Sequence, residues 1–157
     1  MDGVIYHGDR LLPGVKEFVA WLQAEKKRYL FLTNGSVRTP AEIQAKLRRL
    51  GLEVPPDVFH TSAISTAMFL QSQVRDITPR SRKYHCTVLK ESTVSLLPLL
   101  AQTPNGSAYV VGDNGLRSAL IDVGYTLTDT DPDYVVVGET HKYTYEMIEK
   151  AINLVYR

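Results

Sequence analysis

The chain has 157 residues, 44% of them hydrophobic and 22% charged, with a formal net charge of +1, which describes a globular domain and gives no support to nucleic-acid binding. Its one cysteine, Cys86, excludes an internal disulfide framework and fits a reducing compartment. Because no apolar run approaches the roughly 20 residues that span a bilayer and no signal-peptide pattern opens the chain, we expect a cytoplasmic protein without membrane partners.

The first sixty residues alternate between short β-rich apolar runs and helical patterns, which predicts an α/β fold around a parallel sheet. Residues 4–6 read as a strand entering a turn, and apolar spacing from Val15 predicts a helix. The continuous apolar run 29–32 predicts a strand covered on both faces. The polar residues 33–36 would then lie at the carboxyl end of that strand, where open α/β sheets bind ligands.

A second helix has a clear start signal. Thr39 is a suitable N-cap, Pro40 suits the first helical position, and Glu42 completes a capping box. A strand at 58–60 and a helix over 63–71 follow.

The C-terminal third repeats the alternation of strand and helix. Its predicted elements are a strand at 109–111, a helix at 115–121, a strand at 125–127, a strand at 133–138 and an amphipathic helix from Tyr145 to Val155. Asp129, Asp131 and Asp133 lack the Gly and distal Glu of a calcium loop, so we interpret them as a turn before a strand.

The stretch from Val74 to Gly106 differs from the rest. It holds several basic residues and an apolar patch interrupted by Pro98. We interpret it as a linker, an extra subdomain or a segment foreign to the fold. Its basic residues are more often a solvated face than a patch that recruits phosphate.

Six sequence motifs occur in one order along the chain. They are Asp2 to Gly8, Pro13-Gly14, Leu32 to Ser36, Thr61-Ser62-Ala63, Tyr109 to Gly112, and Asp131 to Thr140. This order resembles the class IIA branch of the haloacid dehalogenase-like (HAD) phosphatases, a group related to nitrophenylphosphatases and sugar-phosphate phosphatases. The resemblance implies a HAD-like Rossmannoid parallel-sheet core with its N-terminal part in residues 1–73, an atypical linker or insertion at 74–106, and a partial α/β cap domain at 107–157.

The resemblance also implies roles for four residues. Asp2 would be the general acid that protonates the leaving alcohol, and its backbone carbonyl would be a Mg²⁺ ligand. Thr33 would bind the phosphoryl oxygens with its hydroxyl, while Asn34 and the amides around Gly35 line the same pocket. Gly35 departs from the Asn or Ser common at its position. Without the resemblance, we would interpret Asp2-Gly3 as part of a turn and residues 33–36 as an ordinary loop.

The sequence departs from the family pattern at both ends, where the family has residues of its active site. In the family an apolar strand and the nucleophilic Asp precede the position of Met1, and a Lys and acidic Mg²⁺ ligands follow the position of Arg157. We therefore expect this chain alone to be an inactive fragment of a phosphatase that hydrolyses small phosphorylated metabolites through an aspartyl phosphate. The alternative is a non-catalytic α/β remnant that binds phosphate or a protein. The family often dimerises through its cap, which makes a homodimer the expected assembly.

The four histidines, His7, His60, His85 and His141, lack the spacing of metal ligands. We interpret them as structural or surface residues.

Overall fold

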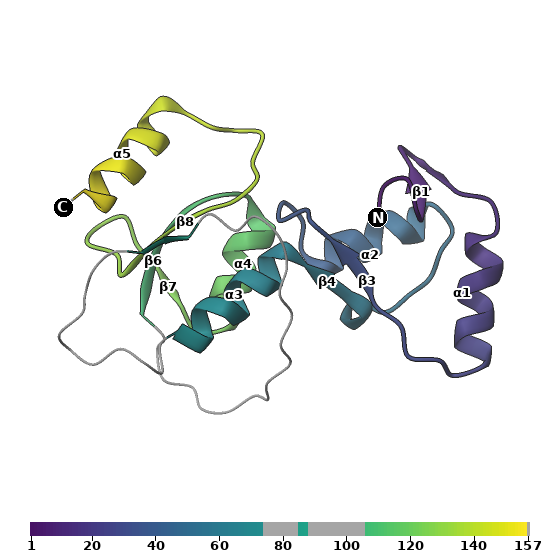
Figure 1. Cartoon of the computed structure of the whole chain (residues 1–157). Helices are drawn as coiled ribbons and strands as arrows, with labels where there is room; N and C mark the ends of the chain where they lie inside the picture. Colours follow the sequence, from purple (N-terminus) through teal and green to yellow (C-terminus); the bar gives the residue numbers. More distant parts are fainter. Residues whose placement is uncertain (74–84, 88–105, 157) are drawn as a thin grey trace. The chain divides into compact units, whose positions relative to one another are not determined.

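A computed structural model describes residues 1–73, 85–87 and 106–156 (Figure 1). The chain forms two compact units. The first unit is Met1–Asn34 with Pro40–Thr61, and the second unit is Gly35–Thr39 with Ser62–Arg157. Residues 62–73 thus group with the C-terminal strands, whereas the sequence-based division placed them with the N-terminal part. The domain boundaries inferred from the family resemblance stay predictions.

The first unit is built from two pairs of short strands and two α-helices. Its elements are β1 (Tyr6–His7), β2 (Arg10–Leu11), α1 (Val15–Ala24), β3 (Phe31–Thr33), α2 (Pro40–Arg49), the 3₁₀ helix η1 (Pro56–Val58) and β4 (Phe59–Thr61). Strands β1 and β2 form an antiparallel hairpin, and β3 pairs with β4 in parallel. The helix predicted from Val15 and the helix predicted from Pro40 are both confirmed.

The start of the chain forms a turn where the sequence predicted a strand. Residues 3–5 are in turns, and the amides of Val4 and Ile5 both donate to the carbonyl of Met1. Gly3 takes the left-handed conformation (φ 74°), which an extended strand excludes. The prediction of a strand over 4–6 was therefore wrong by two residues, and the strand begins at Tyr6.

The expectation that the strand through residues 29–32 is covered on both faces was also wrong. Phe31 points into the core of the first unit and stacks on Phe59 at 5.4 Å between ring centroids. Leu30 and Leu32 flank it and are 61% and 62% exposed. Side chains alternate along a strand, so with one face on the core the other faces outward.

The second unit is a four-stranded parallel sheet with helices. Its elements are α3 (Ser62–Gln73), β5 (His85–Thr87), β6 (Ser107–Val111), α4 (Asn114–Asp122), β7 (Thr126–Leu127), β8 (Tyr134–Val137) and α5 (Tyr145–Val155). The strand order is β5-β8-β6-β7, with every pair parallel. The α/β class predicted from the sequence is confirmed. One strand, β5, falls inside the stretch interpreted as a linker or insertion, and residues 74–84 and 88–105 lie outside the described residues.

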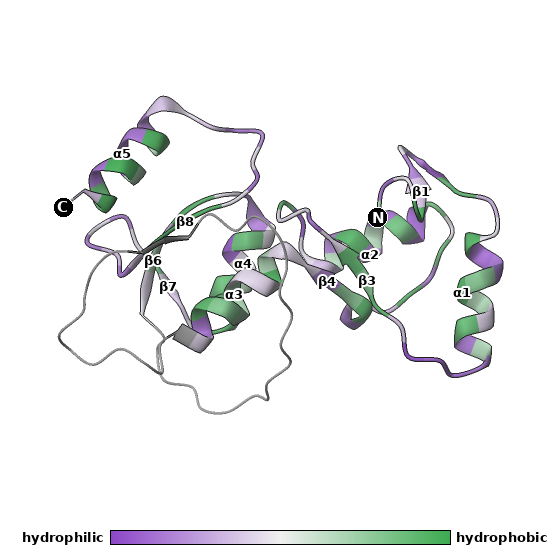
Figure 2. Ribbon diagram, in the orientation of Figure 1, coloured by the Kyte–Doolittle hydropathy of each residue, from purple (hydrophilic) through white to green (hydrophobic). Residues whose placement is uncertain are grey.

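Both faces of this sheet are covered, as parallel sheets require. Alternate residues of β6 point to opposite faces: Ala108 and Val110 pack in a cluster with α3 and α4, and Tyr109 and Val111 pack with α5. Figure 2 shows hydrophobic and hydrophilic residues interspersed along α5. No helix in the described ranges is long and apolar enough to cross a membrane. The cytoplasmic location stays a prediction.

The buried hydroxyl of Tyr125 makes a testable prediction for the second unit. Tyr125 is buried against Tyr134, and its oxygen has no hydrogen-bond partner within the described residues. Burial first, and then the charges of Tyr134 and Asp133, raise the pKa of Tyr125 well above its ordinary value of 10.0. Because an unpaired buried hydroxyl costs about 1 kcal/mol or more, we expect Tyr125→Phe to raise the free energy of unfolding at pH 7 by about 1 kcal/mol.

The same pKa shift sets the direction of the alkaline response. Above pH 10 the unfolded chain loses the Tyr125 proton while the folded chain keeps it, so the stability of the wild type falls as pH rises, by up to about 1.4 kcal/mol per pH unit. The Tyr125→Phe variant should lose less stability between pH 9 and 11. Urea denaturation at both pH values measures the difference, and parallel losses in the two proteins would contradict it.

Candidate functional site

Asp2 lies in the N-terminal turn of the first unit, just before the hairpin. It forms an isolated parallel bridge with Tyr6, and the amide of Gly3 donates to the Tyr6 carbonyl at 2.7 Å. Its side chain is 68% exposed, and Oδ1 lies 3.6 Å from Nδ1 of His7, which is still more open to solvent. His7 is thus a surface residue, as expected, but the sequence did not indicate its proximity to Asp2.

Thr33, Asn34 and Gly35 lie at the carboxyl end of β3. The partner strand β4 ends in register with it, since Thr33 pairs with Thr61. Thr33 is half-buried, Asn34 is exposed, and Thr61 is almost completely buried. Two parallel strands therefore end side by side in hydroxyl groups, at the edge where α/β sheets bind ligands. This is the position that the sequence predicted for residues 33–35.

The strand pairing does not join Asp2 to β3. Asp2 is bridged to Tyr6, whereas β3 pairs with β4. The structure therefore places Asp2 and Thr33 in the same compact unit but in different sheets. The roles assigned to Asp2, Thr33, Asn34 and Gly35 stay predictions.

The residues present fit a Mg²⁺ site only in part. Mg²⁺ takes hard oxygen ligands, keeps several waters and binds through one or two carboxylates together with substrate phosphate. Asp2 supplies one hard oxygen ligand, its backbone carbonyl. Among the described residues, no three His, Cys, Asp or Glu side chains come together as a metal site. Asp2 can therefore contribute to a magnesium site and does not make one alone.

The segment that follows Gly35 is held by the second unit, to which it belongs. The Ser36 hydroxyl accepts a hydrogen bond from the amide of Glu139 at 3.0 Å, and the amide of Gly115 donates to the carbonyl of Val37 at 2.9 Å. Ser36 is buried. Gly115 has no room for a side chain, because a Cβ there would lie 2.5 Å from the Ser36 carbonyl oxygen. The loop after the predicted phosphate-binding residues is thus fixed by contacts with α4 and with the end of β8.

A further polar contact joins the carboxyl ends of β6 and β8. The Thr140 hydroxyl donates to Oδ1 of Asp113 at 2.9 Å and accepts from the amide of Lys142 at 3.1 Å. Sequence reasoning missed this pair and the contacts of Ser36. The available signal was that Asp113 and Thr140 each follow a buried strand within three residues.

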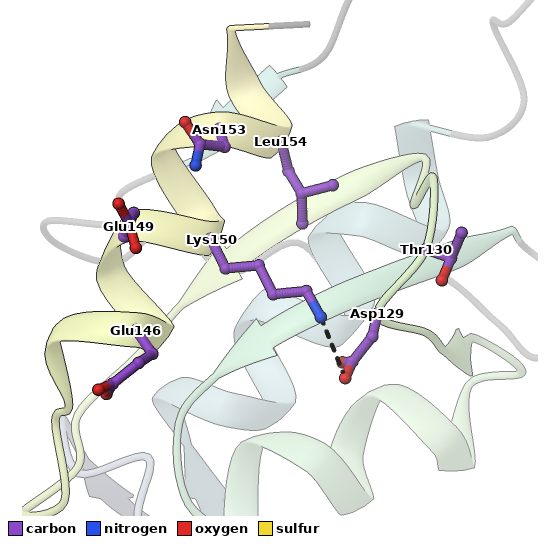
Figure 3. Close-up of a pocket in the computed structure, with 7 residues that line it drawn as sticks. All are labelled: Asp129, Thr130, Glu146, Glu149, Lys150, Asn153 and Leu154. Atoms are coloured by element: carbon purple, nitrogen blue, oxygen red, sulfur yellow. Dashed lines mark ion pairs between the residues drawn. The ribbon is translucent and has the colours of Figure 1, made fainter.

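A pocket of about 300 Å³ lies beside α5 in the second unit (Figure 3). Its charged lining residues are Asp129, Glu146, Glu149 and Lys150. The Lys150 ammonium already pairs with Asp129 at 3.2 Å. A hydrogen bond from its own backbone amide, followed by one from Thr144, lowers the pKa of Glu146 and favours its charged form. Three carboxylates around one paired ammonium repel phosphate, so residues 33–35 remain the candidate phosphate site.

The sequence matches the haloacid dehalogenase-like hydrolase family over residues 1–126. Among curated relatives, a dihydroxyacetone phosphatase from Corynebacterium glutamicum (strain R) is 37% identical over 155 residues, which is 99% of this chain and 46% of the relative. Ribonucleotide monophosphatase NagD from Escherichia coli (strain K12) is 31% identical over 96% of this chain and 48% of its own length. The chain thus spans about half the length of these relatives.

Solved structures agree with the sequence matches. The NagD structure from E. coli K-12 superposes with a TM-score of 0.72 over 99% of this chain and 50% of that chain. A glycerol phosphate phosphatase from Mycobacterium tuberculosis in complex with magnesium shares the fold at 23% identity, with a TM-score of 0.73 over 99% of this chain and 39% of that one. On these matches the chain belongs to the haloacid dehalogenase-like hydrolase family, in the class IIA branch that its motifs resemble.

Proposed function

We propose that this chain supplies part of the active site of a phosphatase that hydrolyses small phosphorylated metabolites. The observation that carries the proposal is the position of Thr33, Asn34 and Gly35 at the carboxyl end of a parallel strand. The names of the relatives support the same class of substrate, since the curated proteins are a dihydroxyacetone phosphatase and a ribonucleotide monophosphatase.

Each residue of the proposed site has a distinct task. The Thr33 hydroxyl, the Asn34 amide and the backbone N–H of Gly35 bind and orient the phosphoryl oxygens. Asp2 donates a proton to the leaving alcohol and then takes one from the attacking water. The nucleophile is a carboxylate from the position two residues before Asp2, which forms an aspartyl phosphate that water hydrolyses.

We propose Mg²⁺ as the cofactor, with Asp2 as one of its ligands. When bound, the cation neutralises charge on the transferring phosphoryl group. The remaining protein ligands would come from outside the described residues, since these residues hold no complete metal site.

A replacement experiment tests the proposal. Residues 1–157 would replace the matched part of the C. glutamicum dihydroxyacetone phosphatase, and the chimera would be compared with the 157-residue chain alone. We expect Mg²⁺-dependent hydrolysis of nitrophenyl phosphate by the chimera and none by the chain alone. Turnover by the chain alone would contradict the proposed origin of the nucleophile. A folded but inactive chimera that still binds inorganic phosphate would favour the non-catalytic alternative.

The proposed assembly is a homodimer through the cap, and α5 offers a suitable face. Tyr145, Ile148 and Ile152 on α5, with Tyr156 directly after it, recur at helical spacing, and all four are exposed. Its other apolar side chains, such as Leu154, pack on the sheet. We expect Ile152→Lys to shift a dimer to monomer, with the dissociation constant raised at least about tenfold. Sedimentation equilibrium measures this shift, and Glu149→Lys, on the side that faces the pocket, is the matched control.

A further inference from the structure

The sequence contains three Asn-Gly pairs, at residues 34–35, 105–106 and 114–115. Asparagine is thermally labile, because the backbone nitrogen of the next residue can attack its side-chain amide carbon. A following glycine speeds this attack, since it has no side chain to obstruct the nitrogen and leaves the backbone free to rotate. Each pair is therefore a candidate for spontaneous deamidation, and the local structure decides how fast each one reacts.

The pair Asn114-Gly115 is held in a conformation that opposes the reaction. Both residues belong to the first turn of α4, where helical backbone keeps the nitrogen of the second residue away from the side-chain carbon of the first. The Gly115 nitrogen is also buried and donates a hydrogen bond to the carbonyl of Val37 at 2.9 Å. The side chain of Asn114 is itself exposed and accepts a hydrogen bond from the Ser118 hydroxyl at 3.3 Å. Exposure of the asparagine alone is thus not sufficient for deamidation.

The pair Asn34-Gly35 lies in a different backbone environment. It directly follows β3, which ends at Thr33, and it belongs to neither a helix nor a strand. Asn34 is exposed, so water reaches its side chain, and Gly35 is half-buried. Loop backbone samples the rotation that brings the Gly35 nitrogen to the Asn34 side chain more readily than a helix does.

We propose that Asn34-Gly35 is a site of spontaneous deamidation in the folded protein. The Gly35 nitrogen forms a bond to the side-chain amide carbon of Asn34, the bond from that carbon to the amide nitrogen breaks, and ammonia leaves with the proton of the Gly35 amide. Water then opens the cyclic imide at either of its two carbonyls and gives aspartate or isoaspartate. The net change is the addition of water and the loss of ammonia, without oxidation or reduction.

The modification changes the candidate phosphate site, and this consequence rests on the proposed function. Aspartate replaces a side chain that donates hydrogen bonds by one that carries negative charge, which repels a phosphoryl group. Isoaspartate also lengthens the main chain by a methylene group before Gly35, which displaces the backbone N–H of that residue. Either product therefore removes groups that the proposed site uses to bind phosphate.

Peptide mapping by mass spectrometry tests the proposal with the full 157-residue chain, incubated at mildly alkaline pH. The mass change is followed separately at Asn34, Asn114 and Asn105, the last of which lies outside the described residues. We expect Asn34 to convert at least about tenfold faster than Asn114 in the folded chain. In urea, where both pairs lie in unfolded chain, the two rates should agree within about twofold. Equally slow conversion of both in the folded chain would overturn the proposal, and so would an unchanged ratio of rates in urea.

Gly35→Ser is the matched variant for the chemistry. Its side chain obstructs the attacking nitrogen, so the conversion of Asn34 should slow at least about fivefold, whereas the rate at Asn114 should stay unchanged. An undiminished rate at Asn34 in this variant would overturn the proposed attack by the Gly35 nitrogen.

A second measurement separates the modification from the proposed function. In the chimera with the C. glutamicum enzyme, hydrolysis of nitrophenyl phosphate and conversion of Asn34 are followed in the same aliquots. We expect the activity to fall in step with the loss of unmodified Asn34, and Asn34→Asp to weaken the binding of inorganic phosphate at least about tenfold.

The outcomes for the chimera are distinct. A stable Asn34 in an active chimera would overturn the deamidation site and leave the proposed function standing. Conversion of Asn34 with full activity would overturn the effect on the phosphate site, and with it the role proposed for this side chain. Conversion of Asn34 in a chimera that was inactive from the start would support the deamidation site and overturn only the proposed function.

Discussion

Replacing Asp2 by Asn in the active chimera should lower kcat/KM for an alkyl phosphate such as glycerol phosphate by about 10²–10⁴-fold. The amide of Asn keeps the size and backbone of Asp2 but cannot donate the proton that a departing alkoxide needs. The Asp2 carboxylate is exposed, and its ion-pair partner among the described residues is the still more accessible surface residue His7, at 3.6 Å, so the substitution disturbs no buried network there. The loss would therefore report chemistry rather than folding.

The choice of substrate separates proton donation from other roles of Asp2. Nitrophenolate is a weak base and leaves without protonation, so the loss of kcat/KM for nitrophenyl phosphate should be much smaller than for glycerol phosphate. The control is Asp9→Asn in the exposed turn between β1 and β2, which should leave both substrates unaffected. Equal losses for the two substrates would show that Asp2 positions the phosphate or the metal and is not the general acid.

The sequence predicts most of the second unit because its elements carry strong local signals. The run Tyr134 to Val137 is continuously apolar, and such runs form strands that are buried on both faces. The spacing of apolar residues from Tyr145 to Val155 likewise marks the last helix. In the second unit, the helices that cover the sheet belong to the same unit as its strands. The burial that the local pattern predicts therefore agrees with the burial in the structure.

The same reasoning fails at β3 because burial there depends on what lies alongside the strand. Leu30 and Leu32 have the pattern of a doubly covered strand, and the pattern cannot state whether the covering polypeptide is present. The interpretation that parallel strands need two covers was physically sound.

The candidate site likewise has features that the local sequence predicts and contacts that it does not predict. The placement of Thr33, Asn34 and Gly35 follows from a strand followed by a polar loop, which is a local signal. The contact between Ser36 and Glu139 joins residues 103 positions apart, and no periodicity or capping pattern encodes such a pairing. The small residues at Gly115 and Gly138 were visible in the sequence, but their meaning appears only when the loop that packs against them is known.

The close approach at Gly115 leads to the second large effect that we expect. Gly115→Ala should lower the free energy of unfolding by about 3 kcal/mol, although Ala is favoured over Gly in a helix by about 1 kcal/mol. A Cβ at this position would lie 2.5 Å from the carbonyl oxygen of Ser36 and 2.6 Å from that of Arg38. These are backbone atoms, so relief requires the loop to move and the hydrogen bond from the Gly115 amide to Val37 to break.

Gly112→Ala is the matched control for this prediction, because its Cβ would meet only the flexible end of Leu116, at 2.9 Å. It should cost less than about 1 kcal/mol, since a side chain can rotate away where backbone cannot. Denaturant midpoints at unchanged slope measure both variants. Similar losses for the two would mean that the loop from Ser36 to Arg38 yields readily. The much larger loss at Gly115 would show that the loop behind the predicted phosphate-binding residues is held rigidly, which a site that positions a phosphoryl group requires.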